Sequence, residues 1–473
     1  MNNRTFSFIP RLLVLAMFLL GTWSYTQVSY STYHQQNNTS KLSFNPVLFA
    51  ADSITKHFDF QSVALKTNSN FRFSDLVREG TGPLVDSLVL DFPRFRSALD
   101  RQNYLDISGE ALIFQFGFVT KPDTLNQETP KRPSYFGFAI RQRAVGGFNF
   151  NKNYIELLTR GNAPFYDQEF STGHAGMNTS IYSEISATYA RELKDKLWFG
   201  LRFKYLMGGL NFTTKKFDLS IDRIEADNYL EVDVNADFRV SGPIEFSLDP
   251  YNFVQDVGIE SPQEIFSTEN SGYAVDLGIV YNLNPDLVFS AAITDIGQIR
   301  WSKDVKQLTL DTTYDYYGGD FSNSIDDTES DYKSPEDVID DLTEDIRNEF
   351  GFNLIESAYT EKLPHTFTAG LRYTVMPSLD FGMMYSNFTS PYYYRETLAF
   401  SANLAIKNAL SLSPTLVLLG NDQLWSCAAG FRVGPLQFHT AISDIGAIKN
   451  PAHSQGFGVQ MGMSYVFPFA LNL

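Results

Sequence analysis

The chain has 473 residues, a net charge of −17, an aromatic content of 15% and a single cysteine. One cysteine excludes an intrachain disulfide framework and cysteine-based zinc sites. The acidity is local, because residues 311–361 hold 16 Asp and Glu side chains against only Lys333 and Arg347. This surplus gives no reason to expect nucleic-acid binding.

The first 26 residues have the layout of a secretory signal peptide. Arg4 and Arg11 precede a compact apolar run, Leu12–Leu20, and polar sequence begins at Gln27. The apolar run is about half of the roughly 20 residues that a membrane helix needs. We therefore predict cleavage near residue 26 and export through the general secretion pathway; an N-terminal anchor or a buried helix is the alternative.

Residues 27–103 form an N-terminal segment that fits a regular strand pattern poorly. One plausible strand surrounds Phe58–Leu65, and mixed polar sequence such as Asn70–Glu79 follows it. We interpret this segment as a first strand together with material that folds into or under a lumen.

Residues 104–473 alternate between apolar and polar positions. In the stretch from Leu197 to Met207 the odd positions are all apolar, while Arg202 and Lys204 stand between them, and Phe457–Phe467 repeats the pattern. Period-two runs of about ten residues are long enough to cross a membrane as tilted strands. Alternation alone would equally suit a soluble β-sandwich.

The connections favour a membrane barrel over a soluble β-protein. Five of them are short and polar: Glu192–Lys196, Leu283–Asp286, Met376–Ser378, Lys407–Asn408 and Val433–Pro435. Longer ones, including Val119–Tyr135, Phe148–Asn178 and Gly297–Leu308, are expected at the opposite end. This asymmetry is typical of outer-membrane barrels. We predict an all-β, transmembrane, antiparallel up-and-down barrel of 12–16 strands, 14 being preferred.

The acidic insert, residues 311–361, contains one predicted helix. Ser334 suits a helix cap and Pro335 the first helical position, and apolar residues from Ile339 to Phe350 follow at helical spacing. The helix is either a lid, plug or partner-docking element or one packed helix on a solvated loop. The acidic run before it lacks the spacing of an EF-hand calcium loop.

No catalytic, metal-binding or cofactor motif stands out, and we do not expect an enzyme. The six histidines show no metal-ligand spacing, and Cys427 is in phase with the apolar face of its strand. Polar side chains on the opposite phase are predicted to face the lumen. They form either a structural ion-pair filling or a constriction that selects a solute. These candidates are Arg141, Arg143, Arg202, Lys204, Asp276, Arg372, Asp380, Arg432 and His439.

Several motifs give the chain a family resemblance. They include Ser43-Phe44-Asn45-Pro46, Thr213-Thr214-Lys215-Lys216, Leu363-Pro364 after the acidic helix, Ile293-Thr294-Asp295-Ile296-Gly297 and Ile442-Ser443-Asp444-Ile445-Gly446. The block from Asp106 to Pro243 resembles a Bacteroidota outer-membrane barrel family of unknown function, of FadL-like or PorV-like general form. Val47 departs from the alanine usual after the early motif. The resemblance implies location and fold, with no catalytic residue.

Two functions remain open at this stage. The first is a channel or transporter for small solutes, hydrophobic ones included. The second is a structural or accessory barrel for secretion, gliding or surface assembly, with outer-membrane lipid around it and a protein partner on its long loops or acidic helix. Long loops and an acidic helix motivate the second function.

Overall fold

The computed structural model describes residues 29–35, 38–50, 54–80, 88–120, 132–160, 170–194, 196–224, 229–248, 254–259, 268–316, 350–391, 393–406, 409–420 and 422–468. The predicted signal peptide and the predicted helix of the acidic insert therefore lie outside the described residues, except for Phe350. None of the described helices is long and apolar enough to cross a membrane.

Fourteen antiparallel strands pair in a closed ring, which confirms the predicted barrel and strand number. The ring closes where the first strand pairs with both the second and the last. In ring order the strands are β1 (Ile54–Ser69), β4 (Gln102–Val119), β5 (Ser134–Asn151), β7 (Gly176–Lys194), β8 (Leu197–Ile224), β12 (Asn270–Asn282), β13 (Leu287–Trp301), β17 (His365–Met376), β18 (Leu379–Thr389), β19 (Tyr394–Ile406), β20 (Leu410–Leu419), β21 (Asp422–Val433), β22 (Leu436–Ile442) and β23 (Gly456–Pro468).

Side chains alternate between the two faces of this sheet, and the apolar face points outward. In β8, Phe203 is 51% exposed, while its neighbours Arg202 and Lys204 are buried. Cys427 lies on the outward face of β21 beside exposed Trp425, as its phase predicted. A soluble barrel would bury the apolar face of its sheet, so the polarity of this sheet is the inverse of that found in a soluble protein.

The two ends of the barrel differ. The strand ends that flank all five predicted short turns lie at one end, together with the start of β1 and the end of β23, and we call this the short-turn end. Residues 195, 407 and 408 of these turns lie outside the described residues. The strand ends on either side of the β4–β5 connection, Val119 and Ser134, also lie there, so the expectation that this connection would join the long loops is wrong. The error arises because strand direction was not followed: β1 runs from the short-turn end to the opposite end, and β4 runs antiparallel to it, back to the short-turn end.

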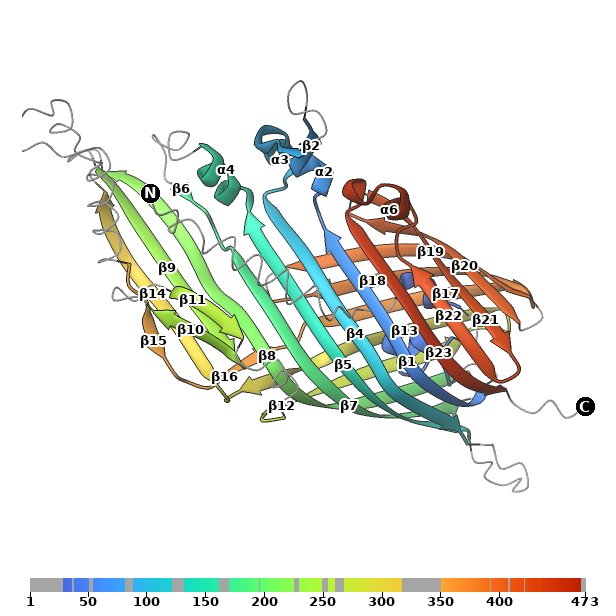
Figure 1. Ribbon diagram of the computed structural model, residues 1–473. Coiled ribbons are helices and arrows are strands. Elements are labelled where there is room, and N and C mark those ends of the chain that lie inside the picture. The colour runs from blue at the N-terminus through green and yellow to red at the C-terminus, as the bar shows by residue number, and fades with distance from the viewer. Residues whose placement is uncertain are drawn as a thin grey trace, which may run out of the picture.

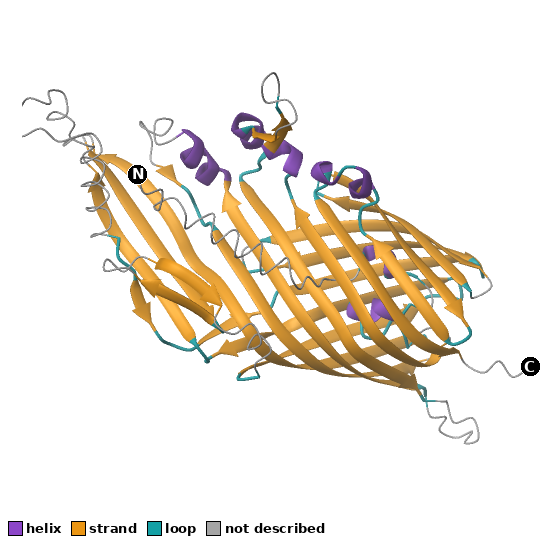
Figure 2. Cartoon of the chain, in the orientation of Figure 1, coloured by secondary structure: helices purple, strands orange, loops and turns teal. Residues whose placement is uncertain are grey.

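The opposite end, the long-loop end, carries the short helices. They are α2 (Phe73–Leu76) and α3 (Phe92–Ala98) between β1 and β4, α4 (Lys152–Arg160) after β5, and α6 (Gly446–Lys449) with η7 (Pro451–His453) before β23. A small hairpin, β2 (Val77–Glu79) with β3 (Leu88–Leu90), sits beside α2. Figure 2 shows these helices along one rim of the barrel.

Part of the sheet continues past the long-loop end as a wing (Figure 1). The outer half of β8 pairs with β9 (Tyr229–Ser241), which pairs with β14 (Val305–Tyr316), and β15 (Asn353–Ile355) follows. Residues at both ends of the predicted acidic insert thus belong to strands. Shorter strands complete the set: β6 (Phe170–Ser171) pairs with β8, β16 (Tyr359–Lys362) with β13, and β10 (Ile244–Leu248) with β11 (Val254–Ile259).

Residues 29–35 and 38–50, which we call the plug segment, lie inside the barrel (Figure 2). They contain two short 3-10 helices, η1 (Tyr30–Thr32) and η2 (Thr39–Ser43). Leu42, Val47 and Phe49 are buried against wall residues such as Tyr135 and Trp198 near the short-turn end. The lumen is therefore filled by a segment that precedes the first strand.

Candidate functional site: a plugged lumen

A network of buried charges crosses the middle of the lumen. We call it the lumen ion network; its cations are Arg141, Arg143, Arg202 and Lys204, and its anions are Glu110, Glu184, Asp276 and Asp295. All eight side chains are buried. Four positive and four negative charges balance, as a low-dielectric interior requires.

Cross-strand pairing builds the network. Arg143 faces Glu110 across β5 and β4, Arg141 faces Glu184 across β5 and β7, and Arg202 faces Asp276 across β8 and β12. Arg141 lies 3.1 Å from Glu110 and 3.2 Å from Glu184. Opposite charges at facing positions stabilise neighbouring strands.

A β-bulge brings the fourth carboxylate into the network. Asp295 adopts a left-handed backbone with φ 66°, and the β12–β13 register shifts at this point. The side chain of Asp295 thereby reaches 2.6 Å from both Arg143 and Lys204, and its backbone N–H donates to Asp276. Bulges re-aim side chains in this way. The motif from Ile293 to Gly297, noticed in the sequence, is this bulge.

The structure places the nine predicted lumen residues in three groups. Five belong to the network: Arg141, Arg143, Arg202, Lys204 and Asp276. Asp380 and His439 are buried elsewhere in the lumen, Asp380 beside Asn403 and His439 beside plug residue Ser40. Arg372 is half-buried. Arg432 is half-buried near the short turns, where it donates to the carbonyls of Gly434 and Val466. The positions of these nine residues do not show whether they select a solute.

Three network members were missed from the sequence: Glu110, Glu184 and Asp295. Glu184 is in phase with Thr188, and that alternation would have placed it inside. Asp295 could not be found by phase, because the bulge shifts the alternation by one residue.

The plug segment is fixed to the wall by polar contacts on many strands. Asn45 Nδ2 donates to the carbonyls of Ile279 and Ala291, at 3.2 and 3.1 Å. Asn45 Oδ1 accepts from the backbone N–H of Val47 at 2.9 Å. Gly278 faces this residue so closely that an added Cβ would lie 2.2 Å from Asn45 Oδ1. The Asn-Pro motif therefore docks the plug on β12 and β13.

A second group of contacts joins the plug to the charged side chains of the wall. Thr39 donates to Asp59 at 2.6 Å, and Asp59 also lies 2.7 Å from His57 Nδ1. His57 Nε2 is 2.9 Å from the hydroxyl of Tyr135. His34 Nε2 lies 3.1 Å from the carbonyl of Met383. Burial, together with the charges of Arg372 and Lys41, lowers the pKa of His34 to about 3, so the docked plug holds a neutral imidazole.

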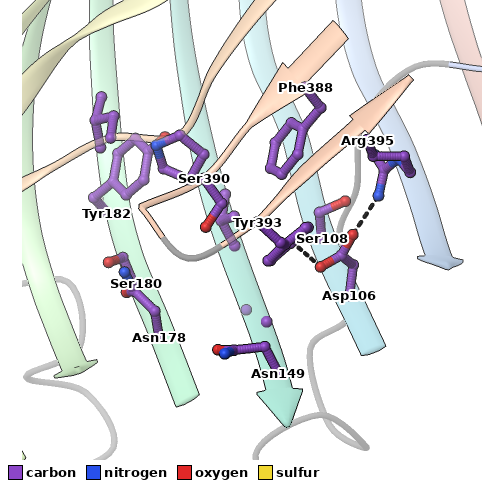
Figure 3. Close-up of a pocket in the computed structure, with 15 residues that line it drawn as sticks. Asp106, Ser108, Asn149, Asn178, Ser180, Tyr182, Phe388, Ser390, Tyr393 and Arg395 are labelled. Atoms are coloured by element: carbon purple, nitrogen blue, oxygen red, sulfur yellow. Dashed lines mark hydrogen bonds and ion pairs between the residues drawn. The ribbon is translucent and has the colours of Figure 1, made fainter. Parts of the chain in front are cut away.

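Two pockets flank the lumen ion network. The outer pocket, towards the long-loop end, encloses about 560 Å³ of space without protein atoms, part of it open solvent. Ser108, Asn178 and Ser180 line it together with Tyr182 and Phe388 (Figure 3). The inner pocket, of about 360 Å³, lies between the network and the plug, with Glu110, Arg141, Ser40 and His439 in its wall.

The order of these features follows one strand. Along β4, Asp106 and Ser108 line the outer pocket, Glu110 belongs to the network, and Leu112 and Gln115 line the inner pocket. The lumen thus contains, in sequence, a pocket, a charged layer and a second pocket, and the plug segment extends from Tyr30, beside Thr397, to Phe49 near the short-turn end. Within the described residues, no group of three or more His, Cys, Asp or Glu side chains is arranged to hold a metal ion.

These features define a closed, plugged 14-stranded β-barrel with an apolar exterior and a charged lumen. The chain belongs to a family of unknown function (DUF5723), whose model matches residues 53–444. This confirms the predicted membership in a barrel family of unknown function. The matched region begins just after the plug segment. No curated protein matches the sequence.

Three solved structures show weak similarity. The toluene transporter TbuX of Ralstonia pickettii is 10% identical, with a TM-score of 0.44 over 96% of this chain and 100% of that chain. A FadL homologue of Pseudomonas aeruginosa is 10% identical, with a TM-score of 0.41 over 94% and 100% of the two chains. The toluene transporter TodX of P. putida is 9% identical, with a TM-score of 0.40 over 94% and 99%. Such TM-scores are too low to support an argument about function.

Proposed function

We propose that the protein spans the outer membrane, with its short-turn end in the periplasm and its long-loop end outside the cell. The inverted polarity of the sheet supports this location, because only lipid makes an outward apolar belt favourable around a closed barrel. The asymmetry of the connections supports the orientation, since such barrels have short periplasmic turns and longer extracellular loops.

We further propose that the barrel passes small solutes through its lumen when the plug segment moves. The observation that carries this proposal is the series of two pockets on either side of the lumen ion network, the inner of them lined by plug residues such as Ser40. Side chains of the strands form only the charged layer, and a separate segment that precedes β1 closes the lumen near the short-turn end. Such a segment can leave without breaking a strand pair.

The outer pocket suggests the class of solute. Tyr182, Phe388 and Leu363 offer apolar surface, while Asn149 and Asn178 offer amide groups. Pockets of this kind suit small molecules that are partly hydrophobic and carry a few polar groups.

Solute-driven swelling of proteoliposomes that contain the full chain tests this proposal. Gly278→Ala should displace Asn45 from the wall, and we expect solutes to enter faster than with the wild type. Gly258→Ala is the matched control, because a Cβ there meets no atom within 4 Å. The proposal is wrong if no class of small solute enters through the Gly278→Ala variant, provided that its barrel remains folded.

An accessory role in secretion, gliding or surface assembly is the second candidate, and the wing supports it. β8 has 28 residues, far more than the roughly 9–11 that a membrane strand needs. Its outer half, with β9 and β14, therefore presents a sheet beyond the membrane. Purification from native membranes should then recover a stoichiometric partner, whereas a clean monomer would argue against this role.

A further inference from the structure

Tyr393, in the β18–β19 connection, and Arg395, the second residue of β19, reach across the lumen to β4. Arg395 and Tyr393 both donate hydrogen bonds to the carboxylate of Asp106, as the dashed lines in Figure 3 show. In the ring of strands, β4 and β19 are separated by five strands on one side and seven on the other. The contact therefore joins nearly opposite walls and is not a pairing of neighbours.

Packing holds this contact in a defined geometry. The Tyr393 ring stacks on Tyr104 with centroids 5.0 Å apart and planes 3° apart. Its hydroxyl also lies against Gly147, where an added Cβ would be 3.3 Å away. Arg395 lies over the ring of Phe388 at 4.9 Å. Burial and the Asp106 carboxylate raise the pKa of Tyr393, so its hydroxyl stays protonated and can donate.

The contact lies at the outer edge of the proposed route. Asp106, Tyr393 and Arg395 all line the outer pocket. Asp106 pairs with Gly147 of β5, which pairs with Asn178 of β7, so Asp106 and Asn178 lie at the same depth in the barrel. Ser180, which also lines the pocket, is two residues deeper along β7. A solute that approaches from the long loops would meet the Asp106 contact before Ser180.

The same cluster touches the first described residues of the plug segment. The Lys66 ammonium lies 3.8 Å from the centre of the Tyr30 ring, and the Tyr30 hydroxyl is 3.4 Å from Thr397 of β19. Burial alone would raise the pKa of Tyr30, but the charges of Lys66 and Arg395 outweigh it and lower the pKa to about 7. The contact at Asp106 and the plug thus share Arg395 as an electrostatic neighbour.

We propose that Asp106, Tyr393 and Arg395 form a latch that shuts the outer mouth of the lumen. Opening it requires the Tyr393 and Arg395 side chains to release Asp106, and no strand pair has to break. Because Tyr30 and Lys66 adjoin Arg395, release of Asp106 also weakens the contacts at the outer end of the plug segment. This inference deepens the proposed passage of solutes by naming its outer gate.

The rate of thiol labelling inside the outer pocket measures how often the latch opens, and it does not depend on passage of a solute. In a Cys427→Ser background, Ser180→Cys supplies one thiol inside the outer pocket, and a membrane-impermeant maleimide is added from the long-loop side of proteoliposomes. Asp106→Asn removes the charged acceptor, and Tyr393→Phe removes one hydroxyl while keeping the stacked ring. Asp237→Asn is the control, since Asp237 also accepts from an arginine, Arg239, but on the wing.

We expect Asp106→Asn to raise the labelling rate about tenfold or more, because charged hydrogen bonds are the stronger ones. Tyr393→Phe should raise the rate about two- to fivefold, and Asp237→Asn should leave it unchanged. Equal labelling rates in all variants would overturn the latch, as would an equal rise in the control. If Asp106→Asn does not fold, as judged by its heat-modified mobility on gels, Tyr393→Phe decides alone. Faster labelling without any solute entry would keep the latch and reject the proposed passage.

Discussion

Acidification should release the plug segment, and His34 sets the pH at which release begins. His34 has a pKa of about 3 in the docked plug, against 6.5 for a free histidine. Because the docked value is the lower one, protonation favours the undocked state. The contribution of His34 to docking of the plug is therefore fully present above pH 6.5 and is lost as the pH falls below that value.

The size of the effect follows from this shift in pKa. At pH 5 a free histidine is 1.5 units below its pKa of 6.5, while His34 in the docked plug is still neutral. At about 1.4 kcal/mol per unit, docking loses about 2 kcal/mol between pH 7.5 and pH 5. The ratio of undocked to docked plug should then rise about 30-fold.

A spin label on the plug measures that ratio. Ser43→Cys in a Cys427→Ser background carries the label, and the mobile fraction of its spectrum is followed from pH 7.5 to pH 4. His34→Gln keeps a donor for the Met383 carbonyl and cannot titrate, so its curve should be flatter by the predicted amount. His439, which is buried and whose Nε2 lies beside plug residue Ser40, should give any pH dependence that remains. Identical curves for His34→Gln and the parent would refute the reasoning.

Two further predictions test the network and the membrane belt. Asp295→Asn leaves Arg143 and Lys204 buried without a full counter-charge, so the barrel should unfold about 3–5 kcal/mol more easily; thermal unfolding in detergent, followed by gel mobility, would show this, and an unchanged midpoint would contradict it. Brominated lipid should quench the fluorescence of Trp425, which is 58% exposed on the outer face, and should leave the fluorescence of buried Trp198 unchanged. Fluorescence quenching of the same size in a Trp425→Phe variant would argue against the proposed apolar belt.

Alternation and turn length were sufficient to predict the barrel, because both follow from local sequence. A strand with one apolar face repeats every two residues, and every odd position from Leu197 to Met207 is apolar. The strand number was also correct, since each short turn joins neighbours in the ring. The β4–β5 connection was assigned to the wrong end because the prediction was based on its length and not on the directions of the two strands that it joins.

The site was harder to predict, because its contacts join residues far apart in the chain. Asn45 meets β12 and β13 more than 230 residues away, and Asp106 meets Arg395 across 289 residues. Neither pairing leaves a periodic signal in the sequence. The bulge at Asp295 also breaks the alternation on which the lumen assignments depended.

The position of the plug segment before the first strand also bears on how the molecule assembles. The backbone N–H of Ser29, its first described residue, donates to the Gln460 side chain of β23, 431 residues away. That bond cannot form until nearly the whole chain has been made and its last strand has joined the first. Contacts of such sequence separation are slow to form. The plug is therefore enclosed when the sheet seals, and the final seam between β1 and β23 is also the step that fixes the interior.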